Sequence, residues 1–70
     1  MRPELKKFGK HLREIRLGKG FSQGDAARIL KVHRTYVSSM ELGRRNPSLL
    51  SIKKLAKAFN VKMSDLLKYD

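Results

Sequence analysis

Cysteine is absent from this chain of 70 residues. Disulfide bonds are therefore excluded, and with no sign of an oxidising compartment we expect a cytoplasmic protein. Apolar runs are no longer than two residues, whereas a membrane-spanning helix needs about 20. The N-terminus also lacks the apolar stretch of a signal peptide. We expect neither a membrane segment nor a secretion signal.

Acidic residues are few compared with basic ones. Six Asp and Glu stand against 17 Lys and Arg, which gives a net charge of +11 and an isoelectric point near 10.6. Such a field attracts polyanions and accelerates their capture, so DNA, RNA and anionic membranes are the partners to consider. The alternative is that lysine-rich helix faces only confer solubility. The length accommodates one small domain, which we expect to span 1–70.

The sequence carries no recognisable catalytic or metal-binding constellation. Ser, His and Asp are present, but their positions indicate neither a pocket nor an activated nucleophile. His11 and His33 stand alone, without cysteine or a second histidine at ligand spacing. We therefore expect a protein that is not an enzyme and that uses no cofactor, metal or small-molecule effector.

Apolar residues that recur every three or four positions predict an all-α protein with five helices and no strands. Pro3 and Glu4 suit the start of the first helix, and the glycines within 18–20 suit its end. The inward residues of this helix are Leu5, Phe8, Leu12 and Ile15.

Two further helices are predicted after the middle of the chain. Ser48 is expected to cap the first of these and Asn60 to close it. A last short helix follows at about 62–68. The inward residues of the longer helix are Leu49, Ile52, Leu55, Ala56 and Phe59.

Two short helices joined by a tight turn are expected over about 22–43. Ser22 can cap the first of them, and Gln23 is expected to be exposed in its opening turn. Lys31 and Val32 then break the apolar pattern. The inward residues of the first helix are Ala26, Ala27 and Leu30.

The second short helix is predicted to begin near His33 or Arg34 and to stop at Gly43. Its inner side carries Val37, Met40 and Glu41, and its outer side carries Arg34, Thr35, Ser38 and Ser39. Outward side chains of this kind are short or forked donors and acceptors, which can recognise base edges in a major groove. The pattern therefore favours a nucleic-acid-binding helix pair.

From Phe8 to Leu67 the chain resembles the lambda-repressor/Cro-like helix-turn-helix proteins. The most specific matches are Gln23, Ala27, Leu30, Val32, Val37, Glu41, Gly43 and Asn46-Pro47-Ser48. Arg34-Thr35-Tyr36-Val37-Ser38, followed by Glu41, Gly43, Arg45 and Asn46, is most similar to the controller proteins of restriction-modification systems. The resemblance implies a compact five-helix DNA-binding domain. It also implies a homodimeric transcription regulator that binds double-stranded DNA at a palindromic operator.

The resemblance assigns roles to individual positions. Base contacts are expected from Arg34, Thr35, Tyr36, Ser38 and Ser39, and DNA backbone contacts from Gln23, His33, Arg44, Arg45 and Asn46. Arg16 and Glu41 match an ion pair that ties the first helix to the third in several relatives. The apolar residues Met63, Leu66, Leu67 and Tyr69 exceed what a short terminal helix needs, so they are the expected dimer contact. An intrachain lid is the alternative for these four.

Three residues depart from the family pattern. Ala26 replaces a larger residue and thins the packing between the two short helices. Lys31 stands where a turn glycine is usual, and a lysine at positive φ costs on the order of 1 kcal/mol. His33 replaces the usual Ser or Thr cap, so we expect the recognition helix to fray more easily at its start.

Alternatives remain for single residues and for the whole protein. Arg34 is either a base contact or a solvated or phosphate-paired arginine, and Tyr36 is either a DNA contact or a packing aromatic. An antitoxin-type protein, which binds DNA and also masks a partner, is the second functional hypothesis. A general binder of RNA or membrane surfaces is the third. Membrane binding is disfavoured because the apolar stripes are needed for the core.

Overall fold

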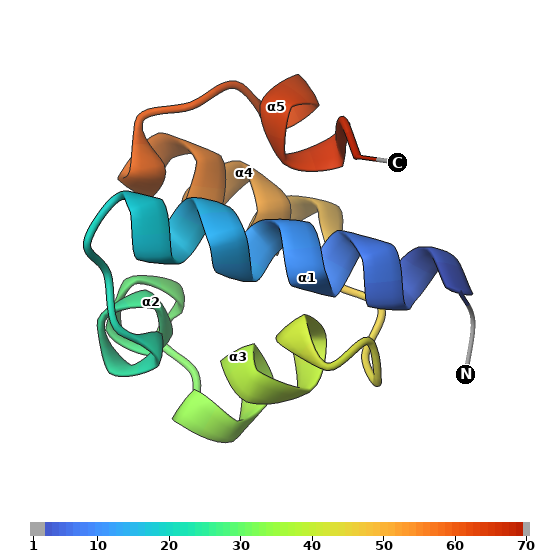
Figure 1. Ribbon diagram of the computed structural model, residues 1–70. Helices are drawn as coiled ribbons and strands as arrows, with labels where there is room; N and C mark the ends of the chain where they lie inside the picture. Colours follow the sequence, from blue (N-terminus) through green and yellow to red (C-terminus); the bar gives the residue numbers. More distant parts are fainter. Residues whose placement is uncertain (1–2, 70) are drawn as a thin grey trace.

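Five helices make up the computed structural model, which describes residues 3–69 (Figure 1). They are α1 (Pro3–Gly18), α2 (Gln23–Leu30), α3 (Arg34–Glu41), α4 (Leu49–Phe59) and α5 (Met63–Leu67). No strand occurs within residues 3–69, so the prediction of an all-α, five-helix fold is confirmed. Residues 1, 2 and 70 of the predicted domain lie outside the described residues.

The helix boundaries follow from local hydrogen bonds. Asp25 N donates to Ser22 Oγ (2.9 Å) and Ser22 N donates to Asp25 Oδ2 (2.8 Å), which forms a capping box at the start of α2. Ser51 N donates to Ser48 Oγ (3.0 Å) at the start of α4. Asn60, with φ of 57°, closes α4 in the left-handed conformation. The caps predicted at 22, 48 and 60 are all present.

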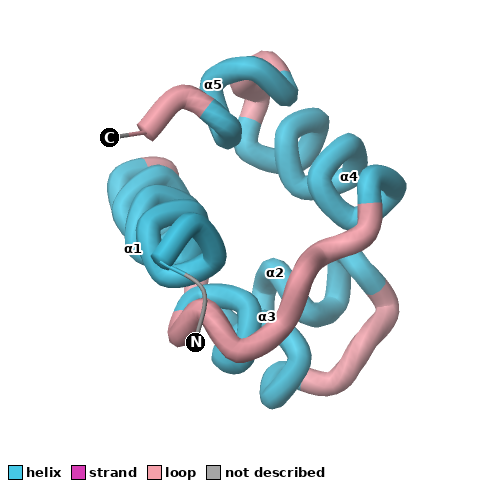
Figure 2. Tube along the Cα trace, turned by 90° about the vertical axis from the view of Figure 1, so that its right-hand side faces the viewer, coloured by secondary structure: helices cyan, strands magenta, loops and turns pink. Residues whose placement is uncertain are grey.

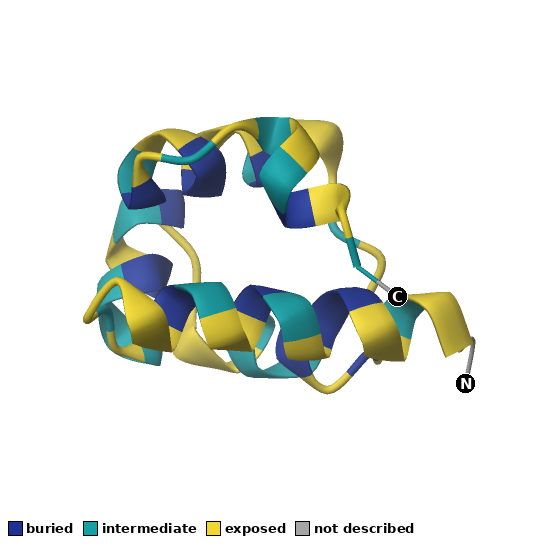
Figure 3. Cartoon of the chain, turned by 45° about the horizontal axis from the view of Figure 1, so that its top comes forward, coloured by how far each residue is buried: buried dark blue, intermediate teal, exposed yellow. Residues whose placement is uncertain are grey.

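The helices surround one apolar core. α1 packs against α3 and α5, α2 packs against α3 and α4, and α4 packs against α5. Figure 2 shows α1 on one side and α4 on the other, with α2 and α3 below them. The buried side of each helix faces this interior and the exposed side faces out (Figure 3). The buried apolar residues are Phe8, Leu12, Ala26, Ala27, Leu30, Val37, Met40, Ile52, Leu55, Ala56, Phe59 and Leu66.

Two glycines allow α1 to lie directly against the end of α3. A Cβ atom at Gly9 would stand 2.4 Å from Met40 O and 2.5 Å from Glu41 O, which is closer than atoms can approach. Gly43, with φ of 75°, lies against the backbone of Lys6 in the same way. Residues with side chains at these two positions would push α1 and α3 apart. Sequence analysis did not single out Gly9.

Two predictions about apolar residues are wrong. Leu49 was expected to face inward, but it is 73% exposed because it is the first residue of α4 and projects beyond the end of the core. Leu66 was expected in a dimer contact, but it is fully buried within the chain, where α5 packs on α1 and α4. None of the helices in residues 3–69 combines the length and apolar character needed to cross a membrane.

Candidate nucleic-acid interface

Helix α3 has one buried and one outward side. Val37, Met40 and Glu41 are buried, whereas Arg34 and Thr35 are exposed at its first turn. The other three outward residues, Tyr36, Ser38 and Ser39, are half-buried. Exposure is therefore greatest at the start of α3. In Figure 1, α3 lies at the edge of the molecule opposite α5, with α1 between them.

The turn before α3 has an unusual composition. Lys31 ends α2 in the left-handed conformation, with φ of 59° and ψ of 47°. His33 has the extended backbone of a cap, yet within residues 3–69 its side chain makes no capping hydrogen bond. The start of α3 consequently depends on backbone hydrogen bonds, such as that from Tyr36 N to His33 O (2.9 Å).

Tyr36 is held between the core and the loop that follows α3. Its ring packs partly against the core, and the guanidinium carbon of Arg45 lies 4.7 Å from the ring centre. Ser39 Oγ donates to Tyr36 O (2.9 Å), so this hydroxyl is engaged within the helix. Tyr36 therefore packs partly against the core, and the DNA contact that the sequence left open for it stays a prediction.

A buried polar network fixes α3 to α1 and α2. Arg16 Nε lies 2.6 Å from Glu41 Oε2, Arg16 Nη2 donates to Glu41 Oε1 (3.0 Å), and Arg16 Nη1 donates to Phe21 O (2.7 Å). Arg16 and Glu41 are only 5% and 7% exposed. Two parallel N–H···O bonds to a carboxylate are among the stronger charge-assisted contacts.

Gln23 belongs to the same network, which corrects the expectation that it is exposed. Its side chain is half-buried, and Gln23 Nε2 donates to Glu41 Oε1 (3.0 Å). The sequence gives no signal for this bond, because the two residues lie far apart in the chain and meet only when α2 packs beside α3. Glu41 therefore orients the first side chain of α2 as well as the guanidinium of α1.

The remaining predicted DNA-facing residues lie in the loop after α3 and at its cap. Arg44, Arg45, Asn46 and His33 are all exposed. At the start of α2, the carboxylate of Asp25 accepts the backbone N–H of Ser22, and this bond lowers the pKa of Asp25. Arg28 pairs with the same carboxylate.

The four residues expected in a dimer contact differ in exposure. Leu66 is buried, Met63 and Tyr69 are half-buried against the core, and Leu67 is 49% exposed. The ring of Tyr69 meets Phe8 edge-on, with 6.2 Å between ring centres. Only Leu67 among the four is therefore largely available to a partner.

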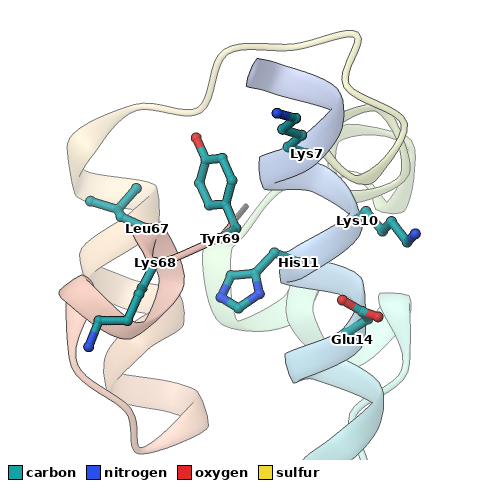
Figure 4. Close-up of a pocket in the computed structure, with 7 residues that line it drawn as sticks. All are labelled: Lys7, Lys10, His11, Glu14, Leu67, Lys68 and Tyr69. Atoms are coloured by element: carbon teal, nitrogen blue, oxygen red, sulfur yellow. The ribbon is translucent and has the colours of Figure 1, made fainter. Parts of the chain in front are cut away.

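A surface hollow lies between α1 and the residues at the end of α5 (Figure 4). His11 Nε2 stands 2.7 Å from Asp65 O, so this nitrogen carries the proton, because a carbonyl can only accept. The lining residues are Lys7, Lys10, His11, Glu14, Leu67, Lys68 and Tyr69. Among residues 3–69, no three His, Cys, Asp or Glu side chains gather in a group that could hold a metal ion.

Comparison with known proteins places the chain among DNA-binding regulators. The family described as Helix-turn-helix matches residues 12–66. Control protein C.BamHI of Bacillus amyloliquefaciens is 46% identical over 63 residues, which are 89% of this chain and 78% of that protein. Control protein C.MunI of Mycoplasma sp is 36% identical, over 86% of this chain and 82% of that protein.

A solved structure gives the same result. The restriction-modification controller protein C.AhdI from Aeromonas hydrophila matches with a TM-score of 0.87 at 43% identity. The match covers 93% of this chain and 98% of that chain. The resemblance inferred from the sequence is confirmed, both for the helix-turn-helix fold and for its similarity to controller proteins.

Proposed function

Because the chain belongs to the helix-turn-helix family of DNA-binding transcription regulators, we propose that it is a homodimer that recognises a palindromic operator through α3. One observation carries the proposal. Arg34 and Thr35 are exposed at the start of α3, while Met40 and Glu41 at its other end are buried. A helix that is held at one end and exposed at the other can place its first turn in a major groove.

Base contacts come from the outward side of α3. The guanidinium of Arg34 can form a bidentate pair with O6 and N7 of guanine, the commonest specific contact in DNA complexes. The hydroxyl of Thr35 lies on the same exposed turn. The full set of proposed base contacts is Arg34, Thr35, Tyr36, Ser38 and Ser39.

Backbone contacts come from the two ends of the helix pair. One amide N–H of Gln23 is donated to Glu41, which leaves the other to donate to a phosphate. The exposed cationic and polar residues beside α3 supply the remaining contacts, which are His33, Arg44, Arg45 and Asn46. Each neutralised phosphate should lower the logarithm of the binding constant by about 0.9 per decade of salt.

The dimer contact lies where α5 ends and α4 begins. Leu67 is 49% exposed, and Leu49 and Leu50 in the first turn of α4 are 73% and 58% exposed. The end of α5 and the start of α4 lie at the same end of the molecule (Figure 1). Leu67 shares a hollow with Pro47 and Ile52, which connects it to that first turn. A second copy would remove this apolar surface from water.

The charge on the neighbouring surface limits how two copies can meet. Lys7, Lys10 and Lys68 rim the hollow between α1 and the chain end (Figure 4), with Glu14 as the acid among its lining residues. Two copies facing each other across this rim would bring like charges together, which is unfavourable. The leucines at the start of α4 and the end of α5 therefore form the better contact.

The test is selection of binding sites from a randomised duplex pool at near-physiological salt. We expect enrichment of a two-fold symmetric motif whose half-sites are centred about one helical turn, roughly 34 Å, apart. An asymmetric motif would contradict the dimer, and enrichment of no motif would favour a general polyanion binder.

A pair of variants tests the dimer contact directly. Leu50→Glu places a charge in the proposed contact and should weaken operator binding and shift sedimentation towards the monomer. Leu17→Glu is the matched control, because Leu17 is similarly exposed (52%) but lies near the far end of α1. Equal behaviour of the two variants would reject this contact.

A further inference from the structure

A hollow with apolar walls lies on the outward side of the helix pair, between the turn before α3 and the loop after it. It is lined by Val32, His33, Thr35, Tyr36, Ser39 and Arg45. Val32 is 37% exposed and Tyr36 is half-buried. Val32, Thr35 and Tyr36 bring apolar carbon atoms to the lining, and Arg45 adds a positively charged side chain.

Val32 is much less buried in the core than Val37 is. Val37 is 1% exposed, whereas Val32 follows the left-handed Lys31 and leaves much of its side chain in water. Among the polar lining groups, the Ser39 hydroxyl is already donated to Tyr36 O. The hollow therefore offers apolar contact more than hydrogen bonds.

The position of Tyr36 is fixed from two sides. Its ring packs partly against the core, and the guanidinium of Arg45 lies 4.7 Å from the ring centre. Cation–π contact of this kind keeps a positive charge beside the ring. The fixed ring of Tyr36 offers apolar contact, and Arg45 beside it carries a positive charge. A ligand that fits both has an apolar group with a negative charge close by. Double-stranded DNA has this character where a methyl group enters the major groove.

We propose that this hollow receives the C5-methyl group of a pyrimidine, from thymine or 5-methylcytosine, and that Val32 and Tyr36 are specificity-determining residues. The inference rests on the proposed function, since it places the outward side of α3 in the major groove. The C5-methyl group is the apolar feature that the base edges present there, and apolar side chains and the Thr methyl group are its usual contacts. The Arg45 guanidinium then lies within the same contact, on the side facing the DNA backbone.

The experiment uses the duplex obtained by site selection. Each thymine of one half-site is replaced by uracil, which removes the methyl group and leaves the hydrogen-bonding edge unchanged. In a second series each cytosine is replaced by 5-methylcytosine. Binding is measured with the full chain, with Val32→Ala, and with Leu17→Ala as a matched loss of an exposed apolar side chain elsewhere.

We expect one position at which the methyl group strengthens binding about fourfold, the effect of burying one such group. A loss on uracil identifies thymine as the source, and a gain on cytosine methylation identifies 5-methylcytosine. Val32→Ala should lose this sensitivity, while Leu17→Ala should keep it.

Two results would overturn the inference. One is the absence of any methyl response in both series, and the other is an equal response in Val32→Ala and the unmodified chain. Both presuppose an enriched motif, so they leave the proposed function intact. If selection yields no motif at all, the proposed function and this inference fail together.

Discussion

The two ends of α3 are held in different ways. At its C-terminal end, Met40 and Glu41 are buried, and α1 lies against the backbone at Gly9. At its N-terminal end, His33 supplies no side-chain cap within the described part of the chain, and Arg34 is exposed. The contrast shows how a small protein can present a recognition helix. Packing and a buried ion pair anchor one end of the helix, so Arg34 and Thr35 at the other end can remain exposed.

The difference between the two ends also suggests a role for the buried ion pair of Arg16 and Glu41. A buried ion pair is weak evidence for stability, because desolvation of both charges offsets their attraction. Here Arg16 and Glu41 join α1 to α3, and Glu41 also binds the amide of Gln23. We interpret the pair as a device that sets the position of α3 and of the first residue of α2 relative to α1.

The largest effect is expected from breaking the anchored end with Glu41→Ala. The change leaves the guanidinium of Arg16 buried without its carboxylate, so we expect a loss of about 3 to 5 kcal/mol in the free energy of unfolding. Urea unfolding measures it. The double variant Arg16→Met, Glu41→Leu removes both charges and should recover most of that loss. A double variant as unstable as the single one would show that the polar network itself stabilises the fold.

The contact between α1 and α3 can be broken without changing charge. Gly9→Ala places a methyl carbon 2.4 Å from Met40 O and 2.5 Å from Glu41 O, so it should cost about 3 kcal/mol, the upper part of the range for overpacking. Gly18→Ala is the control, because the added Cβ would meet no described atom within 4 Å apart from its chain neighbours and the backbone of its own helix. Thermal unfolding of both variants provides the measurement. A similar melting temperature for the two would contradict the close approach of the helices.

The turn before the free end is strained, and this strain can be relieved. Lys31→Gly should raise the free energy of unfolding by up to about 1 kcal/mol, because glycine adopts positive φ without the Cβ penalty. Part of the gain is offset by the greater freedom of glycine in the unfolded chain. Asn60→Gly, at nearly the same φ, should gain less because asparagine tolerates this conformation. A melting temperature that stays the same or falls in Lys31→Gly would argue against strain.

The smallest effect concerns pH and the capped start of α2. The pKa of Asp25 is lowered in the folded protein, chiefly by the backbone N–H of Ser22. A carboxyl group with a lowered folded pKa stabilises the fold above its unfolded pKa, and this contribution disappears as the pH falls through the folded pKa. Asp25→Asn should therefore reduce the loss of stability between neutral and acid pH. Urea unfolding of this variant and of the unmodified chain at neutral and acid pH provides the measurement. An equal loss of unfolding free energy in the two proteins would contradict the role of Asp25.

Much of the fold could be predicted because its determinants are local. Helical periodicity identified the five helices, and the chemistry of Ser22, Ser48 and Asn60 identified their caps. The exposed start of α3 followed from the same periodicity, since Val37 and Met40 define the opposite side. These features depend on neighbours only a few residues away.

The features that sequence analysis missed depend on how the helices meet. Gly9 looks like any helical glycine until α3 is placed beside it. The bond from Gln23 to Glu41 requires α2 and α3 to pack together. Leu49 and Leu66 both fit an apolar pattern. Leu49 lies beyond the end of the core and is exposed, whereas Leu66 is buried within the core. Periodicity cannot distinguish these two cases, because it does not show where the core ends.

We propose that the exposed start of α3 recognises bases, whereas its buried end holds the helix in the fold. Binding of Arg34→Ala to the selected operator and to a scrambled duplex tests it most directly, with Arg13→Ala on exposed α1 surface as a control of equal charge. We predict that Arg34→Ala loses about 1 to 3 kcal/mol of discrimination between the two duplexes, while its melting temperature is unchanged. An equal loss of affinity for both duplexes, matching that of Arg13→Ala, would contradict the claim.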